Sequence, residues 1–180
     1  MNLADHSFTN AIRRFCGNLL PQTLNLDKED SFKDVPPPDP AQNEIYLKVL
    51  RNVDFENVEF RINEFLSKKG FKDEELRLLD FAAELGLSLH QASYYLNKNL
   101  KTTFTDFMNF NRLEEAKRLI FENGKKFNLL EICYASGFNS LATFHRACRK
   151  FAKCTPKELR FEIIERKNEI RSISGYKNEI

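Results

Sequence analysis

The sequence of 180 residues predicts an all-α protein, and three observations lead to that fold class. After residue 43, apolar residues recur at helical spacing, and no convincing alternating strand or Asn-Gly hairpin is present. Two glycines, Gly86 and Gly137, are each followed within three residues by a serine that can cap a new helix. Between the two turns, about 20 residues have the pattern of one long helix.

The composition excludes several classes of protein. Hydrophobic residues make up 42% of the chain and charged residues 30%, which is typical of a globular domain and excludes wholesale disorder. No apolar run approaches the roughly 20 residues of a bilayer span, and the N-terminal sequence MNLADHSFTN lacks a signal pattern. We therefore expect a cytoplasmic protein, with no membrane contact by this segment.

A proline-rich stretch at residues 31–43, SFKDVPPPDPAQN, divides the chain. It holds four of the six prolines and cannot form a continuous helix or ladder, so it is predicted to be a linker or exposed loop. Before it, Phe8 to Leu19 has the apolar spacing of a short amphipathic helix. The predicted organisation is a helix and linker at 1–43, a main domain at 44–165 and a tail at 166–180.

The helices that precede the first glycine turn are predicted from apolar spacing and from residues suited to helix ends. Helical runs cover Ile45 to Leu50 and Val58 to Lys69, and the second is expected to stop at Gly70 in a left-handed cap. A further helix from Leu76 to Leu85 is expected to end at Gly86.

The later helices are predicted from capping pairs, in which a Ser, Thr or Asn precedes an acidic or amide residue by three positions. These pairs are Ser88 with Gln91, Thr103 with Asp106, and Asn128 with Glu131. The connecting helix is expected at about 103–123, another helix from near Ser140 to a break at Pro156, and the last helix from Phe161 to Ile170.

The two turn regions are copies of one another. The segments FAAELGLSLHQASYYLNKNLKTTF and ICYASGFNSLATFHRACRKFAKCTP align with one residue inserted after the second turn. The matched positions are Ala82 with Cys133, Ala92 with Phe144, Leu96 with Cys148, and Lys101 with Lys153. Each copy predicts a helix-turn-helix, at about 76–98 and 128–151, because a small residue permits close helix approach and the glycine permits a sharp turn.

A helix-turn-helix can place its second helix in the major groove of DNA, where phosphates accept hydrogen bonds from free N–H groups at the helix start. Charge supports this role, since residues 139–160 hold six Lys and Arg against one acid, and residues 88–101 hold two lysines and no acid. A connecting helix of about 30 Å also matches the roughly 34 Å between successive major grooves. The sequence thus predicts binding to two successive grooves of double-stranded DNA.

Two sets of residues show a family resemblance. On the connecting helix they are Phe104, Phe107-Met108, Arg112-Leu113, Ala116 and Leu119-Ile120. The more diagnostic set is Glu131-Ile132, Gly137-Phe138, Phe144, Thr155-Pro156 and Arg160. With them, the sequence from about Phe55 to Phe161 resembles the DNA-binding domain of the AraC/XylS family of bacterial transcription regulators. The resemblance implies transcription regulation and contact with RNA polymerase. If the chain is a fragment of a longer protein, it also implies an N-terminal sensor or dimerisation domain.

The sequence departs from the family pattern at four positions. The family usually has alanine where Cys133 stands, phenylalanine where Cys148 stands, and glycine where Lys101 and Lys153 stand. A left-handed helix end costs a non-glycine residue roughly 1 kcal/mol, so we expect these two ends to be looser or differently shaped. The resemblance also implies that Arg112 is structural and ties the connecting helix to its neighbours.

By the pattern match, two sets of outward side chains would contact DNA. The first helix would present Ser88, Leu89, His90, Ser93, Tyr94, Asn97 and Lys98, with Ala92 and Leu96 inward. The second would present Ser140, Leu141, Ala142, His145, Arg146, Arg149 and Lys150, with Phe144 and Cys148 inward. The serines and lysines, with Lys101 and Lys153, suit backbone contacts, which position the protein without specifying a sequence.

Arg146 is the strongest candidate for base recognition, because a guanidinium can bond guanine O6 and N7 in a bidentate manner. The alternative role of Arg146 is a salt bridge to a neighbouring helix. Leu141 and Ala142 suit thymine methyl groups, although exposed apolar residues are common. His90 and His145 suit phosphates as well as bases.

Other functions are weighed against this one. His145, Cys148 and Cys154 could share a metal, but helical spacing places Cys148 inward and His145 outward, so neither a metal nor another cofactor is predicted. The histidines lie near no nucleophile or acid pair, and no phosphate-binding glycine loop is present, so an enzyme is not predicted. The alternative is a helical protein-interaction module that has lost specific DNA binding, favoured by a net charge of only +2 and by a first recognition helix without arginine.

Overall fold

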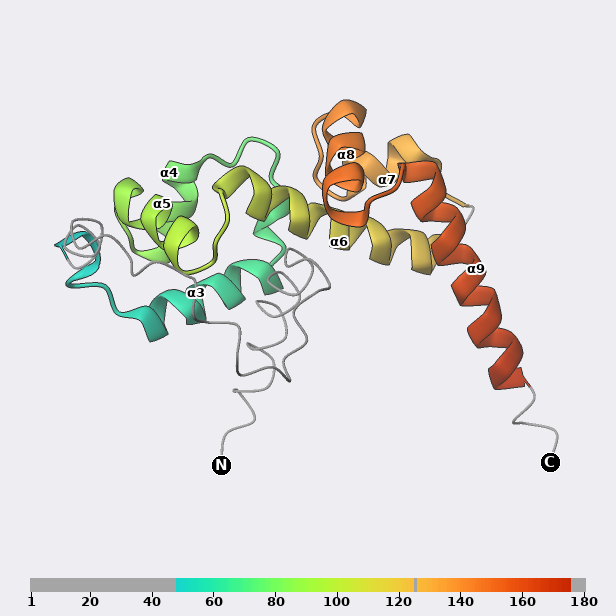
Figure 1. Ribbon diagram of the computed structural model, residues 1–180, viewed down its shortest axis with the longest axis horizontal. Coiled ribbons are helices and arrows are strands. Elements are labelled where there is room, and N and C mark those ends of the chain that lie inside the picture. The colour runs from blue at the N-terminus through green and yellow to red at the C-terminus, as the bar shows by residue number, and fades with distance from the viewer. Residues whose placement is uncertain (1–47, 125, 176–180) are drawn as a thin grey trace, which may run out of the picture. The chain divides into compact units, whose positions relative to one another are not determined.

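The computed structural model describes residues 48–124 and 126–175, and all regular elements within these residues are helical (Figure 1). They are α3 (Phe55–Ser67), the 3-10 turn η1 (Gly70–Lys72), α4 (Leu78–Leu85), α5 (Leu89–Lys98), α6 (Phe104–Asn123), α7 (Leu129–Ala135), α8 (Leu141–Ala147), the π-helical turn η2 (Cys148–Ala152) and α9 (Pro156–Gly175). The predicted all-α class is confirmed. The helix expected at Phe8 to Leu19 and the linker at 31–43 lie outside the described residues.

The chain divides into two compact units. Unit 1 comprises the chain up to Lys68 together with Leu76–Phe104, and unit 2 comprises Lys69–Glu75 together with the chain from Thr105 onward. Unit 1 therefore contains α3, α4 and α5, whereas unit 2 contains α7, α8, η2, α9 and all but the first residue of α6. Each unit holds one helix-turn-helix, α4 with α5 and α7 with α8, and α6 joins them as the predicted connecting helix.

Each unit has its own apolar core. In unit 1, Ile62 of α3, Phe81 of α4 and Leu96 of α5 are at most 1% exposed. In unit 2, Leu113 of α6 and Phe144 of α8 are fully buried. Burying one such side chain contributes roughly 1.5–3 kcal/mol, so these residues hold the helices of each unit together.

The two glycine turns have the same backbone hydrogen bonds. Gly86 and Gly137 both adopt positive φ, at 69° and 93°. In each turn the glycine N–H donates to a carbonyl three residues back, and the next N–H donates to one five residues back, as in a Schellman motif. These bonds are Gly86 to Ala83 (3.0 Å), Leu87 to Ala82 (2.9 Å), Gly137 to Tyr134 (2.9 Å) and Phe138 to Cys133 (3.1 Å). The repeat predicted from the sequence is therefore a repeat of backbone structure.

Residues 69–75, here called the strap, are held in unit 2 by Arg112 of α6. The Nε of Arg112 donates to the Phe71 carbonyl at 2.7 Å, and its Nη2 donates to the Asp73 carbonyl at 2.8 Å. Arg112 is only 8% exposed and Phe71 is 6% exposed. Burial lowers the pKa of Arg112, but a guanidinium stays protonated in proteins and so remains a charged donor. Arg112 therefore has the structural role that the family resemblance implies, because it ties α6 to residues 69–75.

A buried carboxylate, Glu115, makes the second connection to the strap. Its Oε1 lies 3.0 Å from the Nζ of Lys69, 3.0 Å from the Nζ of Lys72 and 2.8 Å from Nη2 of Arg118. The hydrogen bonds from Arg118, Lys69 and Lys72 hold the pKa of Glu115 far below its usual range, although burial acts in the opposite direction. Three cations thus compensate one buried anion, which satisfies the condition for a stabilising buried charge.

The second glycine turn packs directly against the strap. A Cβ atom added to Gly137 would lie 2.6 Å from the Cα and 2.9 Å from the carbonyl oxygen of Lys72. Glycine is therefore required there twice, for its positive φ and for the close approach of the Lys72 backbone.

Several predicted helix ends differ from the structure. The left-handed residue after α3 is Lys69, with φ of 57°, rather than Gly70, because Lys69 there reaches Glu115. The last helix begins at Pro156 rather than Phe161, since proline suits a first helical position. The helix expected from Leu76 begins at Leu78, where Asp80 accepts a hydrogen bond from the Arg77 N–H.

Replacing each glycine turn residue by alanine is expected to give graded losses of stability. Gly137→Ala should cost about 3–5 kcal/mol, from left-handed strain plus overlap with Lys72. Gly124→Ala, with φ of 58° and no atom within 4 Å, should cost only about 1 kcal/mol. Gly86→Ala meets only the flexible Arg61 side chain and should fall between them. Urea unfolding of the three variants measures these losses, and equal losses of unfolding free energy would contradict the predicted order.

Glu115→Gln is expected to lower the free energy of unfolding by about 2 kcal/mol at neutral pH. Because the folded-state pKa of Glu115 lies below the ordinary 4.5, its stabilisation is present above that pH and is lost as the pH falls toward the folded-state value. Urea unfolding at pH 7 and pH 3 should therefore show a smaller acid loss in the variant than in the unaltered protein. If the variant and the unaltered protein lose the same free energy of unfolding between pH 7 and pH 3, groups other than Glu115 cause the pH dependence.

Candidate nucleic-acid interface

The start of α5 is set by a capping box. The Ser88 hydroxyl accepts from the Gln91 N–H at 3.2 Å, and the Gln91 side-chain oxygen accepts from the Ser88 N–H at 3.0 Å. The amide nitrogen of Gln91 also donates to the Val49 carbonyl at 3.2 Å, so it ties the segment before α3 to the helix. The capping pair predicted from the sequence is confirmed, and the bond to Val49 is additional.

The two faces of α5 separate as predicted. Ala92 and Leu96 are buried, and Tyr95, which the sequence pattern did not single out, is buried with them. The predicted DNA-contact residues are outward or at the edge: Ser88, Leu89, His90 and Asn97 are exposed, and Ser93, Tyr94 and Lys98 are half-buried. Asn97 donates to the Ser93 carbonyl within the helix at 2.8 Å. The Lys98 ammonium lies 5.8 Å from the Tyr94 ring centroid, within the range of a cation–π contact.

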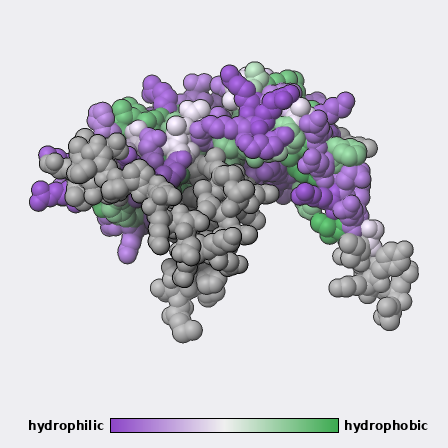
Figure 2. Space-filling view, viewed as in Figure 1, coloured by the Kyte–Doolittle hydropathy of each residue, from purple (hydrophilic) through white to green (hydrophobic). Residues whose placement is uncertain are grey.

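The second recognition helix, α8 with η2, has the same organisation. Ser140 caps it, with its hydroxyl accepting from the Thr143 N–H at 3.3 Å. Phe144 and Cys148 face inward as predicted, and Ala147 is buried beside them. The predicted contact residues other than the half-buried Ser140 are exposed: Leu141, Ala142, His145, Arg146, Arg149 and Lys150. In Figure 2 the surface over α8 is mainly hydrophilic.

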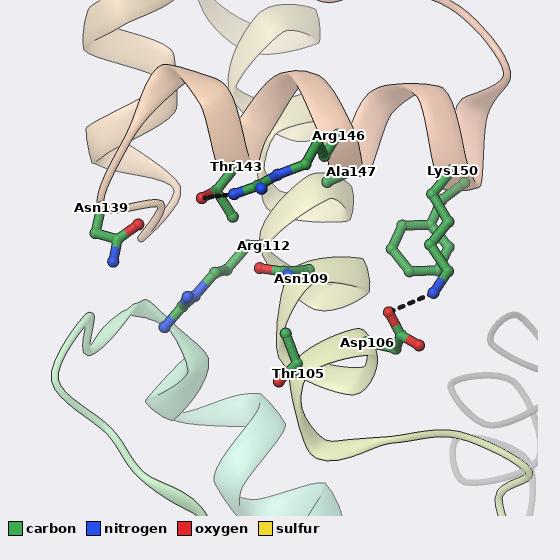
Figure 3. Close-up of a pocket in the computed structure, with 10 residues that line it drawn as sticks. Thr105, Asp106, Asn109, Arg112, Asn139, Thr143, Arg146, Ala147 and Lys150 are labelled. Atoms are coloured by element: carbon green, nitrogen blue, oxygen red, sulfur yellow. Dashed lines mark hydrogen bonds and ion pairs between the residues drawn. The ribbon is translucent and has the colours of Figure 1, made fainter.

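Arg146 has no carboxylate within ion-pair distance among the described residues. Its Nη2 donates to the Thr143 hydroxyl at 3.2 Å, one turn back on the same helix (Figure 3). Within the described residues, Arg146 therefore does not form the salt bridge to a neighbouring helix that was its alternative role. Thr143 was not predicted as a site residue, although its position one turn before Arg146 was visible in the sequence.

The two lysines that stand where the family usually has glycine both adopt a left-handed backbone conformation. Lys101 has φ of 52° and Lys153 has φ of 60°. Both residues thus keep the left-handed backbone that glycine usually provides, although Lys101 lies beyond the cap of α5 at Asn99 and the turn before Lys153 is π-helical. The Lys153 ammonium donates to the Lys150 carbonyl at 2.9 Å, which offsets part of the strain through a helix C-terminal contact.

A polar cavity of about 530 Å³ lies in unit 2 beside the second recognition helix (Figure 3). Its lining residues are Thr105, Asp106, Asn109, Arg112, Asn139, Thr143, Arg146, Ala147, Lys150 and Phe151. Within it, the Lys150 ammonium is 2.6 Å from the Asp106 carboxylate. This ion pair was not predicted, because 44 residues separate its members and Asp106 looked like a helix-capping residue only.

The cysteines are not arranged as metal ligands. Burial raises the pKa of the Cys148 thiol to about 12 and also raises the pKa of Cys133. Thiolates are the form that binds metals, so both side chains act as core residues. Within residues 48–124 and 126–175, no group of three His, Cys, Asp or Glu side chains is placed to hold a metal ion.

Replacing the left-handed lysines by glycine is expected to stabilise the fold. Lys101→Gly and Lys153→Gly should each raise the free energy of unfolding by about 1 kcal/mol, because glycine adopts positive φ without strain. The matched control, Lys98→Gly within regular helix α5, should lose about 1 kcal/mol. Chemical denaturation of the three variants provides the comparison, and a loss in the first two would mean that the lysine contacts outweigh the strain.

Comparison with known proteins gives one match. Residues 81–161 match the family model of a helix-turn-helix domain of the AraC type. No curated protein and no solved structure matches the chain. Among the described residues, no helix is long and apolar enough to cross a membrane. The matched segment runs from α4 to the first turns of α9, and so includes both recognition helices and the connecting helix. Over residues 81–161, this match supports the AraC/XylS-type DNA-binding domain that the sequence predicts.

Proposed function

We propose that this protein is a sequence-specific DNA-binding transcription regulator that inserts α5 and α8 into successive major grooves. The observation that supports the proposal most strongly is the duplication of one helix-turn-helix arrangement. Both recognition helices begin at a serine cap after a glycine turn, bury the matched residue pairs Ala92/Leu96 and Phe144/Cys148, and are followed by a lysine with positive φ. Two copies of one helix-turn-helix arrangement, each with an exposed second helix, suit a ligand that repeats, as the major groove of DNA does.

The proposed contacts divide into base recognition and backbone positioning. On α8, Arg146 is proposed to bond a guanine edge, which is worth roughly 1–3 kcal/mol of discrimination. On α5, His90, Tyr94 and Asn97 are the exposed or half-buried polar side chains that we assign to bases. The backbone contacts are assigned to Ser88, Lys98, Lys101, Ser140, Arg149, Lys150 and Lys153. Leu89, Ser93, Leu141, Ala142 and His145 complete the two surfaces.

The proposed DNA-binding domain covers residues 44–165. The domain binds as one chain to an asymmetric site, since most outward positions differ between its two helix-turn-helix copies, as at His90 and Ala142 or Tyr94 and Arg146. The family resemblance implies RNA polymerase as a further partner, and this contact is part of the proposal. An N-terminal sensor or dimerisation domain in a longer protein belongs to the same proposal.

Selection of bound duplexes from a random DNA library tests the proposal. We expect two short enriched blocks about one helical turn apart, because each recognition helix contacts one major groove. Arg146→Ala should relax the second block only and weaken binding roughly 10-fold to 100-fold. The affinity of the unaltered protein should fall by about 0.9 log units per log unit of salt for each phosphate contact.

A matched control is Arg166→Ala, which removes an exposed arginine from α9, outside both recognition helices. It should leave both blocks unchanged. No enriched sequence, together with partner binding that is insensitive to salt, would support the helical protein-interaction module instead. Enrichment that is indifferent to Arg146 would require a different assignment of the contacts made by α8.

A further inference from the structure

We propose that Asp106 restrains DNA binding by the second recognition helix, because it holds the ammonium group of Lys150. The inference rests on the proposed function and adds a residue that limits affinity, located on the connecting helix rather than on a recognition helix. Removing the Asp106 charge should therefore make the protein bind DNA more tightly.

The ion pair joins α6 to η2 and is short and partly exposed. Asp106 lies in the first turn of α6, and Lys150 lies in η2, which continues the second recognition helix. The two charged atoms, Oδ1 and Nζ, are 2.6 Å apart. The side chain of Lys150 is 53% exposed and that of Asp106 is 25% exposed, so a phosphate can reach the pair from solvent.

The surroundings of the pair are otherwise favourable to an anion. Figure 3 shows Arg146 and Lys150 on one wall of the cavity and Asp106 with Asn109 on α6 opposite them. Asp106 is the only acid among the ten residues that line this cavity. The third cation of the cavity, Arg112, is buried and already donates to the strap carbonyls. Asp106 is thus the one charge in this cavity that opposes a phosphate.

A phosphate that approaches Lys150 has to compete with a carboxylate already bound to it. While Lys150 stays paired, it neutralises Asp106 and releases no counterion from DNA. When the carboxylate is replaced by a neutral amide of the same shape, Lys150 becomes available for a phosphate. Affinity should then rise, and its salt dependence should become steeper by about one phosphate contact.

The test is Asp106→Asn, measured by fluorescence anisotropy on a duplex selected with the unaltered protein, over a series of KCl concentrations. We expect affinity to rise by roughly 3-fold to 10-fold at low salt and the slope of log K against log salt to steepen by about 0.9. An unchanged or weaker affinity, with the slope unchanged, would overturn the inference. Asp106→Ser is measured beside it, so that the result does not depend on one variant folding.

Two controls separate the ion pair from a general charge effect. Glu122→Gln makes the same change in net charge at the other end of α6, about 24 Å away along the helix axis, and should leave affinity and slope unchanged. Combining Asp106→Asn with Lys150→Gln should abolish the gain in affinity. A gain that persists in the double variant would mean simple repulsion between Asp106 and DNA, which contradicts the inference.

The unaltered protein distinguishes the two possible failures. If it binds the selected duplex with a salt-dependent affinity while Asp106→Asn changes nothing, only the role of Asp106 is wrong. If no duplex is selected and binding to DNA is absent at low salt, the proposed function itself fails, and the role of Asp106 fails with it.

Discussion

The anchoring of the strap by Arg112 and Glu115 is the interaction on which unit 2 depends. Arg112 satisfies two backbone carbonyls of residues 69–75, and Glu115 draws in the lysines of the same segment. Because Gly137 packs against the Lys72 backbone, the position of the strap also sets the second glycine turn. The buried charges of α6 therefore help to position the turn between α7 and α8.

The two helix-turn-helix copies have the same backbone turn but core residues of different size at matched positions. At the first matched position, Ala92 of α5 corresponds to the larger Phe144 of α8. At the second, Leu96 corresponds to the smaller Cys148. All four side chains are at most 1% exposed, so the increase at one site accompanies a decrease at the next. A larger residue at one position and a smaller one at the next help to keep the core closely packed. Two cores of different composition can therefore support the same turn.

The outward surfaces of the two helices have different chemistry, and this difference follows from their side chains. The face of α5 has aromatic and neutral polar groups, with Lys98 placed over Tyr94. The face of α8 with η2 is cationic, yet Lys150 of η2 is neutralised by Asp106 from the connecting helix. The effective charge that α8 presents is thus lower than its sequence indicates. Neighbouring elements, and not the recognition helix alone, set the strength of an electrostatic surface.

Local rules determined much of this protein. The caps at Ser88 and Asn128, the positive φ of Gly86, and the inward and outward faces of both recognition helices follow from spacing and side-chain chemistry, and the structure confirms them. Which outward residues contact DNA stays a prediction. Tertiary structure alone decided that the left-handed residue after α3 is Lys69, that residues 69–75 belong to unit 2, and that Asp106 pairs with an ammonium 44 residues away. Each of these depends on a partner distant in the chain, and a local pattern contains no information about such a partner.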